Sequence, residues 1–179
     1  MSVCQHKSQK EVIIGIDPGF GRVGWGIIEQ NTKNEWRVAV YGCIETSTKK
    51  TFVDRLAEIH YDLEEVIKKY QPTRMAVEEL FFAKNVTTGI QVAQARGVII
   101  LTGVENNLEI DEFTPLQVKQ AVTGYGRAEK PQMQKMVAMT LGIKGKIKSD
   151  DAADALAIAL CAGQSLWIKK LSFSLKRRQ

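Results

Sequence analysis

The spacing of apolar and polar residues predicts three strands at the start of the chain. Residues 11–17 form an apolar run rich in valine and isoleucine, which suit a buried strand. Pro18 and Gly19 end this strand, because proline cannot donate to a sheet and glycine accepts a positive φ. Short turns then lead to strands at about 23–30 and 36–46, and three strands joined in this way predict an antiparallel meander.

The rest of the chain alternates helices with short strands. Apolar residues recur at helical spacing over 51–70, which predicts an amphipathic helix, and a short strand follows at 75–77. A strand that is reached through such a helix adds to the sheet in parallel. The pattern continues with a helix at 86–104, a strand at 109–113 and helices over 114–123, 131–141 and 151–163. We therefore expect an α/β fold with a five-stranded mixed sheet flanked by helices.

Length and composition indicate one globular domain. The chain has 179 residues, of which 44% are hydrophobic and 25% charged, which is typical of a soluble protein with a substantial core. We expect a flexible N-terminus at 1–10, one domain over 11–165 and a basic tail over 166–179. Two interpretations of the tail remain open: a disordered DNA-binding arm and a solubilising end.

Cysteine usage and the lengths of apolar runs predict where the protein resides. Cys4, Cys43 and Cys161 are odd in number and far apart, which argues for a reducing compartment and against a disulfide frame or a zinc knuckle. The first residues lack the apolar segment of a secretion signal, and the longest apolar run, 155–163, is too short to span a bilayer. We expect a cytoplasmic protein that has no membrane partner.

Charge is spread unevenly along the chain. The net charge is +5, yet residues 114–148 hold seven basic side chains against one acidic side chain. Residues 51–79 hold seven acidic side chains against four basic ones. A basic half beside an acidic patch indicates a polyanion held near a cation site, although solvated lysine faces give the same pattern.

Acidic residues stand at the ends of predicted elements. Asp17 ends the first strand and Glu78 ends the fourth, each directly after a buried apolar run. A buried carboxylate loses its hydration unless a positive group meets it, so both are candidate metal ligands or catalytic acids. An aspartate that merely opens a turn explains Asp17 equally well. Asp151 and Asp154 are three residues apart and share a face of the last helix, and capping would explain only one of them.

These four acids converge if the first and fourth strands are neighbours and the last helix crosses the sheet beside them. Four close carboxylates repel one another without cations, and hard oxygen ligands suit Mg²⁺ or Mn²⁺. Two divalent ions would balance the charge and could clamp an in-line phosphoryl displacement. Residues 19–24 also match the glycine spacing of a dinucleotide-binding turn, but a strand follows them instead of a helix, so we reject that interpretation.

Eight short motifs, in order and at matching spacing, resemble the RuvC family of Holliday junction resolvases. They span about residues 11–163 and read Gly15-Ile16-Asp17-Pro18-Gly19, Gly24-Trp25-Gly26, Ala76-Val77-Glu78, Phe82-Ala83-Lys84-Asn85, Gln94-Ala95-Arg96-Gly97, Gln117-Val118-Lys119-Gln120, Ala128-Glu129-Lys130 and Asp151-Ala152-Ala153-Asp154-Ala155-Leu156-Ala157. Each motif alone is weak evidence, whereas all eight in register are strong evidence.

The resemblance implies an RNase H-like fold and a homodimer that nicks two opposing strands of a four-way DNA junction, leaving 5′-phosphate and 3′-hydroxyl ends. It implies that two Mg²⁺ ions per active site, with Mn²⁺ as a substitute, activate water and stabilise the leaving oxygen. The metal ligands and catalytic residues would be Asp17, Glu78, Asp151 and Asp154. We interpret Glu79 as a neighbour, which becomes the ligand if the strand register is shifted by one residue.

The resemblance also assigns DNA contacts. Lys119 and Lys130 match basic positions at the DNA backbone, where contacts give affinity and salt dependence rather than sequence choice. Lys84 lies in one of the matching motifs and is expected to bind DNA as well. Phe81 matches an aromatic residue that stacks on an unpaired base, and a plain core position is its alternative.

Small residues form a stripe on the helix at 86–104. Gly89, Ala93 and Gly97 are four residues apart, so another backbone could approach them closely. By pattern alone the stripe fits a dimer interface or tight packing on the sheet, and the resemblance favours the interface. The family also works with the RuvA–RuvB branch-migration complex, although no residue here shows that contact.

Two other functions fit parts of the sequence. Actin-like and sugar-kinase ATPases share the Asp-x-Gly strand end, but they need a second lobe, which 179 residues do not hold. A junction-binding module without catalysis is the other alternative. The presence of all four carboxylates favours the nuclease.

Overall fold

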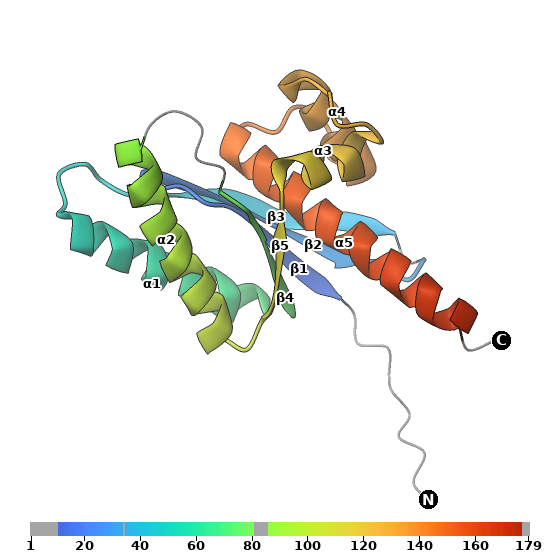
Figure 1. Ribbon diagram of the computed structural model, residues 1–179, viewed down its shortest axis with the longest axis horizontal. Helices are drawn as coiled ribbons and strands as arrows, with labels where there is room; N and C mark the ends of the chain where they lie inside the picture. The colour runs from blue at the N-terminus through green and yellow to red at the C-terminus, as the bar shows by residue number, and fades with distance from the viewer. Residues whose placement is uncertain (1–10, 34, 81–85, 177–179) are drawn as a thin grey trace, which may run out of the picture.

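A five-stranded sheet with helices on both faces forms the centre of the molecule (Figure 1). The computed structural model describes residues 11–33, 35–80 and 86–176. The elements are β1 (Val12–Asp17), β2 (Arg22–Gln30), β3 (Trp36–Glu45), α1 (Phe52–Tyr70), β4 (Arg74–Glu78), α2 (Val86–Glu105), β5 (Glu109–Phe113), α3 (Pro115–Thr123), α4 (Lys130–Thr140) and α5 (Asp150–Lys176).

The sheet has the strand order β3-β2-β1-β4-β5. β1, β2 and β3 pair antiparallel, as the meander predicted, while β4 and β5 run parallel to β1. The parallel strands are reached through α1 and α2, because a chain must cross over the sheet to begin again at the same end. The predicted α/β class and mixed sheet are therefore confirmed.

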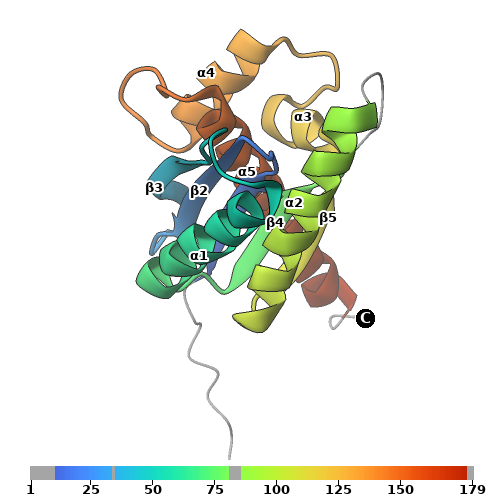
Figure 2. The same cartoon turned by 90° about the vertical axis from the view of Figure 1, so that its left-hand side faces the viewer.

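Strand alternation divides the core into two layers. On β1, Ile13 belongs to the layer beneath α5, while Ile14 and Ile16 belong to the layer beneath α1 and α2. Figures 1 and 2 show the corresponding arrangement, with α1 and α2 on one face of the sheet and α3, α4 and α5 on the other. A side chain at the end of β1 therefore faces α5 if it continues the series of Ile13.

The helix starts follow local capping chemistry. The Thr51 side chain accepts a hydrogen bond from the Asp54 backbone N–H at 3.2 Å, so α1 begins where the sequence predicted. Thr114 caps α3 in the same way, and Gln117 completes a capping box. Gly124 ends α3 in the left-handed conformation, which confirms the predicted break.

The predicted end of the last helix near residue 163 is wrong, because α5 continues to Lys176. Residues 164–176 contain neither proline nor glycine, so no residue there interrupts the helix. Gly163, which suggested an end, instead lies directly against the Trp36 ring of β3. The chain is therefore helical up to residue 176, while the domain boundary at 165 and the role of the basic tail remain predictions. None of the described helices is long and apolar enough to cross a membrane.

Candidate active site

Two predicted acids lie side by side at the ends of neighbouring parallel strands. Ile16 of β1 pairs with Val77 of β4, so Asp17 and Glu78 follow at the same edge of the sheet. Asp17 alternates in phase with Ile13, and Glu78 alternates in phase with the α5-side residue Ala76. Both carboxylates therefore point towards the face that α5 covers.

Two glycines allow the backbone of α5 to lie directly on the sheet. A Cβ atom at Gly15 would overlap the Ala155 carbonyl oxygen, and a Cβ atom at Gly24 would overlap the Asp151 carbonyl oxygen. Glycine is required at both positions because of this close approach. The first turns of α5, which carry Asp151 and Asp154, are thereby held over the ends of β1 and β2.

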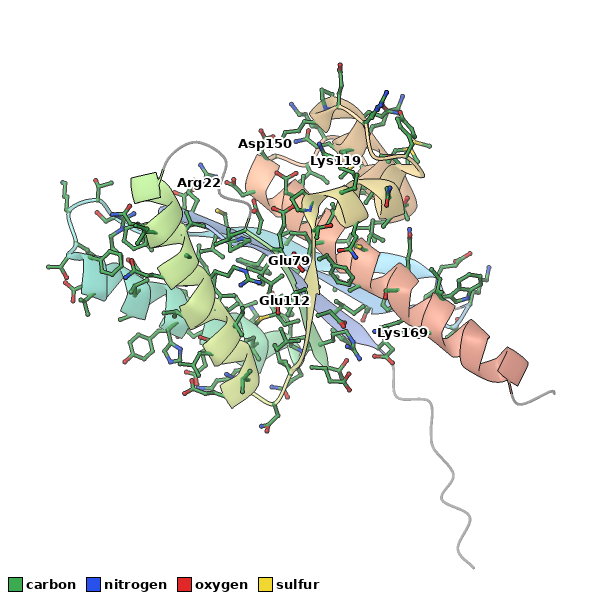
Figure 3. The ribbon with its side chains drawn as sticks, viewed as in Figure 1. Arg22, Glu79, Glu112, Lys119, Asp150 and Lys169 are labelled. Carbon is green, nitrogen blue, oxygen red and sulfur yellow. The ribbon has the colours of Figure 1, made fainter. Side chains whose placement is uncertain are left out.

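A cleft of about 240 Å³ opens where these elements meet. Asp17, Glu78 and Asp154 line it together with Lys119 of α3 and Lys130 of α4. The remaining lining residues are Pro115, Val118, Met133, Ala157 and Ile158. Figure 3 shows Lys119 on α3 and Asp150 at the start of α5, on the same side of the molecule. The cleft thus combines three predicted acids with two predicted DNA-binding lysines.

Burial, with added repulsion from neighbouring acids, raises the pKa of three carboxylates in the cleft. Burial raises the pKa of Asp17 to about 7, with further contributions from Asp154, Glu78 and Asp151, while Lys130 opposes the change. Burial also raises the pKa of Glu78, helped by Asp154 and opposed by Lys119. Burial likewise raises the pKa of Asp154, against the effect of Lys130. Lys119 and Lys130 therefore do not fully offset the effects of burial and repulsion on these carboxylates.

Basic side chains contact the acids at the start of α5. Lys130 Nζ lies 3.0 Å from Asp154 Oδ2 and 3.6 Å from Asp150 Oδ2. Arg22 Nε lies 2.8 Å from Asp151 Oδ2, and the Cys43 thiol is 3.9 Å from the same oxygen. No sequence motif identified Arg22 as a site residue, although its spacing of two residues from Gly24 on β2 places it on the α5 face.

Asp151 is the predicted acid that does not line the cleft. Its carboxylate turns to Arg22, although its charge still raises the pKa of Asp17. Within residues 11–33, 35–80 and 86–176, no three acidic, histidine or cysteine side chains are arranged to hold a metal ion. The donor set nevertheless fits a hard divalent cation, because all donors are carboxylate oxygens and burial raises the pKa of three of them.

Glu79 lies outside the cleft. It lines a separate pocket with Arg96 of α2 and Glu112 of β5, and Figure 3 shows Glu79 and Glu112 beside each other. The Arg96 guanidinium pairs with Glu112 and donates to the Glu78 carbonyl oxygen at 2.9 Å. Glu78, and not Glu79, is therefore the acid that joins Asp17. Phe81 and Lys84 lie outside the described residues.

The small-residue stripe of α2 does not pack on the sheet along its whole length. Ala95 and Ile99 are fully buried and make that contact. Gly97 is exposed, and a Cβ atom there would meet nothing within 4 Å. Gly89 is partly buried, and Ala93 lines the pocket of Glu79. The outward face near Gly97 also exposes more than half of Ile90, Leu101 and Val104.

Comparison with known proteins places these features in a family. The family model described as "Crossover junction endodeoxyribonuclease RuvC" matches residues 13–162. A protein of that name from Halothermothrix orenii is 55% identical over 154 residues, which cover 86% of this chain and 93% of the relative.

Solved structures agree with the sequence comparison. The Thermus thermophilus RuvC structure matches with a TM-score of 0.79 and 33% identity, covering 87% of this chain and 96% of the other. Thermus thermophilus RuvC in complex with a Holliday junction substrate matches with a TM-score of 0.78 and 30% identity over the same shares. These matches confirm the RNase H-like fold.

Proposed function

Because the chain belongs to the RuvC family of crossover junction endodeoxyribonucleases, it is an enzyme that resolves Holliday junctions, and we propose that it cuts DNA by metal-dependent hydrolysis in the cleft between β1, β4 and α5. The observation that carries this proposal is the meeting of Asp17, Glu78 and Asp154 in one cleft with Lys119 and Lys130. Acids and lysines that line one cleft suit a phosphate bound beside cations.

The four predicted carboxylates would hold the metal. Asp17, Glu78 and Asp154 face one cleft, and Asp151 becomes a ligand when its carboxylate leaves Arg22. We propose two Mg²⁺ ions, with Mn²⁺ as a substitute, because two divalent ions balance four carboxylates. Bound metal would supply an activated water and charge stabilisation at the leaving 3′ oxygen, which gives 5′-phosphate and 3′-hydroxyl ends.

Lys119 and Lys130 are proposed to bind the phosphates that flank the cut. Lys119 faces Glu78 closely enough to lower its pKa, and Lys130 contacts Asp154, so both amines stand where a phosphate would enter. Such contacts fix the position of the backbone and add salt dependence to binding. Contacts from Phe81 and Lys84 remain predictions.

We propose that α2 forms the homodimer interface. Ile90, Gly97, Leu101 and Val104 are spaced by seven, four and three residues, so they lie on one helix face. That face is apolar and open, as an interface between two copies requires. A two-fold dimer carries two clefts, which suits paired nicks on opposing strands of a two-fold junction. Contact with RuvA–RuvB and a cytoplasmic location remain predictions.

The test is cleavage of a synthetic mobile four-way junction and of a linear duplex, with and without Mg²⁺. We expect paired symmetric nicks in the junction only, dependent on metal and lost in Asp154→Asn and Glu78→Gln. Glu79→Gln is the matched control, because Glu79 is adjacent to Glu78 but lines another pocket. Equal cutting of junction and duplex, or loss of cutting in Glu79→Gln alone, would contradict the proposal.

A further inference from the structure

Arg22 is a basic residue that pairs with Asp151 outside the cleft, and neither the sequence motifs nor the family resemblance assigns it a role. It begins β2 and alternates in phase with Gly24, so the strand itself directs its side chain to the α5 face. Arg22 Nε lies 2.8 Å from Asp151 Oδ2. Gly24 lies on the same strand as Arg22 and lets the Asp151 backbone of α5 pack directly against it, so the fold keeps the two partners close together.

Arg22 also has a second acidic neighbour. Its Nη2 atom lies 3.4 Å from Glu45 Oε1, on the strand residue that pairs with it in the β2–β3 register. The guanidinium therefore keeps a partner when it leaves Asp151. The pair with Asp151 is also half open to water, since 53% of the Arg22 side chain and 33% of the Asp151 side chain are exposed. Separating Arg22 from Asp151 should therefore cost little free energy.

Arg22 and a metal ion would compete for Asp151. The oxygen that accepts from Arg22 Nε is one of only two that the carboxylate offers, and a guanidinium beside a bound divalent ion is repelled by it. Lys130 contacts Asp154 in a similar way, but Lys130 lines the cleft and is already proposed to bind DNA. Arg22 is not among the residues that line the cleft.

We propose that Arg22 is a displaceable counter-ion that competes with the divalent ion for Asp151 and so raises the metal concentration at which the site fills. The proposal rests on the proposed function, because it takes Asp151 to be a metal ligand. Ion pairs with this degree of exposure change an equilibrium by roughly 1.5- to 5-fold. Removing Arg22 should therefore tighten divalent ion binding by roughly 1.5- to 5-fold.

Calorimetric titration of Mn²⁺ into the full-length protein without DNA tests this directly. We expect tighter binding in Arg22→Gln and unchanged binding in Arg37→Gln. Arg37 is a close match, because it makes a cross-strand ion pair with Glu29 at 2.7 Å and 57% of its side chain is exposed. Glu29 pairs with Val12, at the opposite end of β1 from Asp17. Unchanged or weaker binding in Arg22→Gln would overturn the role of Arg22.

A second variant separates direct competition from a general charge effect. In an Asp151→Asn background, Arg22→Gln should no longer tighten Mn²⁺ binding, because the contested carboxylate is gone. An equal gain in that background would overturn the proposal. Tighter Mn²⁺ binding in Arg22→Gln together with wild-type binding in Asp17→Asn would leave Arg22 in its role and contradict the proposed metal site. A wild-type protein that binds no Mn²⁺ would overturn both.

A spectroscopic readout covers the case in which Arg22→Gln folds poorly. The Nε–H resonance of Arg22 in the wild-type protein should shift as diamagnetic Mg²⁺ is added, because its acceptor on Asp151 is taken away. The same resonance should not respond to Mg²⁺ in Asp151→Asn. A resonance that stays fixed in the wild-type protein while Mg²⁺ binds would show that Arg22 and the metal do not compete.

Discussion

Asp17→Asn should make the metal-free protein more stable at alkaline pH, although it removes a predicted catalytic residue. The pKa of Asp17 rises from 3.8 to about 7 in the fold, so the folded state prefers the protonated acid. Above pH 3.8 the unfolded chain gives up this proton while the folded chain keeps it, and stability falls as the pH rises towards 7. Asparagine carries no charge and avoids this loss.

The size of the effect follows from the width of that pH window. Each unit of pKa difference corresponds to about 1.4 kcal/mol, so a carboxyl whose pKa rises by about three units destabilises the fold at pH 8 by about 4 kcal/mol. At pH 5 only the part of the window above 3.8 has been crossed, and the cost is about 2 kcal/mol. The gain from Asp17→Asn should therefore be roughly two to three times as large at pH 8 as at pH 5.

Urea unfolding in the presence of EDTA measures this gain directly. Wild type and Asp17→Asn are compared at pH 5 and pH 8, with Glu79→Gln as a control acid that lies outside the cleft. Adding Mg²⁺ at pH 8 should then stabilise the wild type more than Asp17→Asn, because a bound cation removes the repulsion. If Asp17→Asn is no more stable than wild type at pH 8, or gains equally at both pH values, the electrostatic account of the cleft is wrong.

Three further perturbations follow from the structure. Lys119→Gln and Lys130→Gln should each weaken junction binding and lower the slope of log affinity against log salt by about 1, measured by fluorescence anisotropy; an unchanged slope would exclude a phosphate contact. Gly24→Ala should cost about 1–3 kcal/mol of unfolding free energy because the methyl group overlaps the α5 backbone, while Gly21→Ala, whose added Cβ atom would make only an ordinary contact, should be neutral or stabilising in the same urea experiment. Leu101→Glu should shift the protein from dimer to monomer in sedimentation, and a dimer that persists would place the interface elsewhere.

Local sequence signals predicted the elements well because their causes are local. The apolar run before Asp17 ends at a proline, and the start at Thr114 has its capping partner within one turn, so both boundaries were foreseeable. The end of α5 was not foreseeable, because Gly163 packs against Trp36 of β3 instead of ending the helix. This contact comes from a strand that is distant in sequence, so no local pattern could indicate it.

The candidate site depended on contacts that no local pattern determines. Asp17 and Glu78 meet only because β4 adds beside β1, and the resemblance, more than the spacing, indicated that order. Arg22 was missed because strand alternation identifies its face only once α5 is known to cover it. The turning of Asp151 away from the cleft was unforeseeable for the same reason.

The glycine contacts under α5 have a genetic consequence. At Gly24 and Gly15 an added methyl group would overlap backbone atoms of the helix, which every residue shares, so no side-chain substitution on α5 can restore the space. At Gly26 the two nearest obstacles are side-chain atoms of Leu156, which a smaller residue removes, while the Leu156 backbone nitrogen lies farther away at 3.3 Å. A search for second-site suppressors should therefore recover compensating changes at Leu156 for a Gly26 variant, and only reversion for a Gly24 variant. Whether a glycine variant beneath α5 can be compensated therefore depends on whether the added methyl group overlaps the helix backbone or a helix side chain.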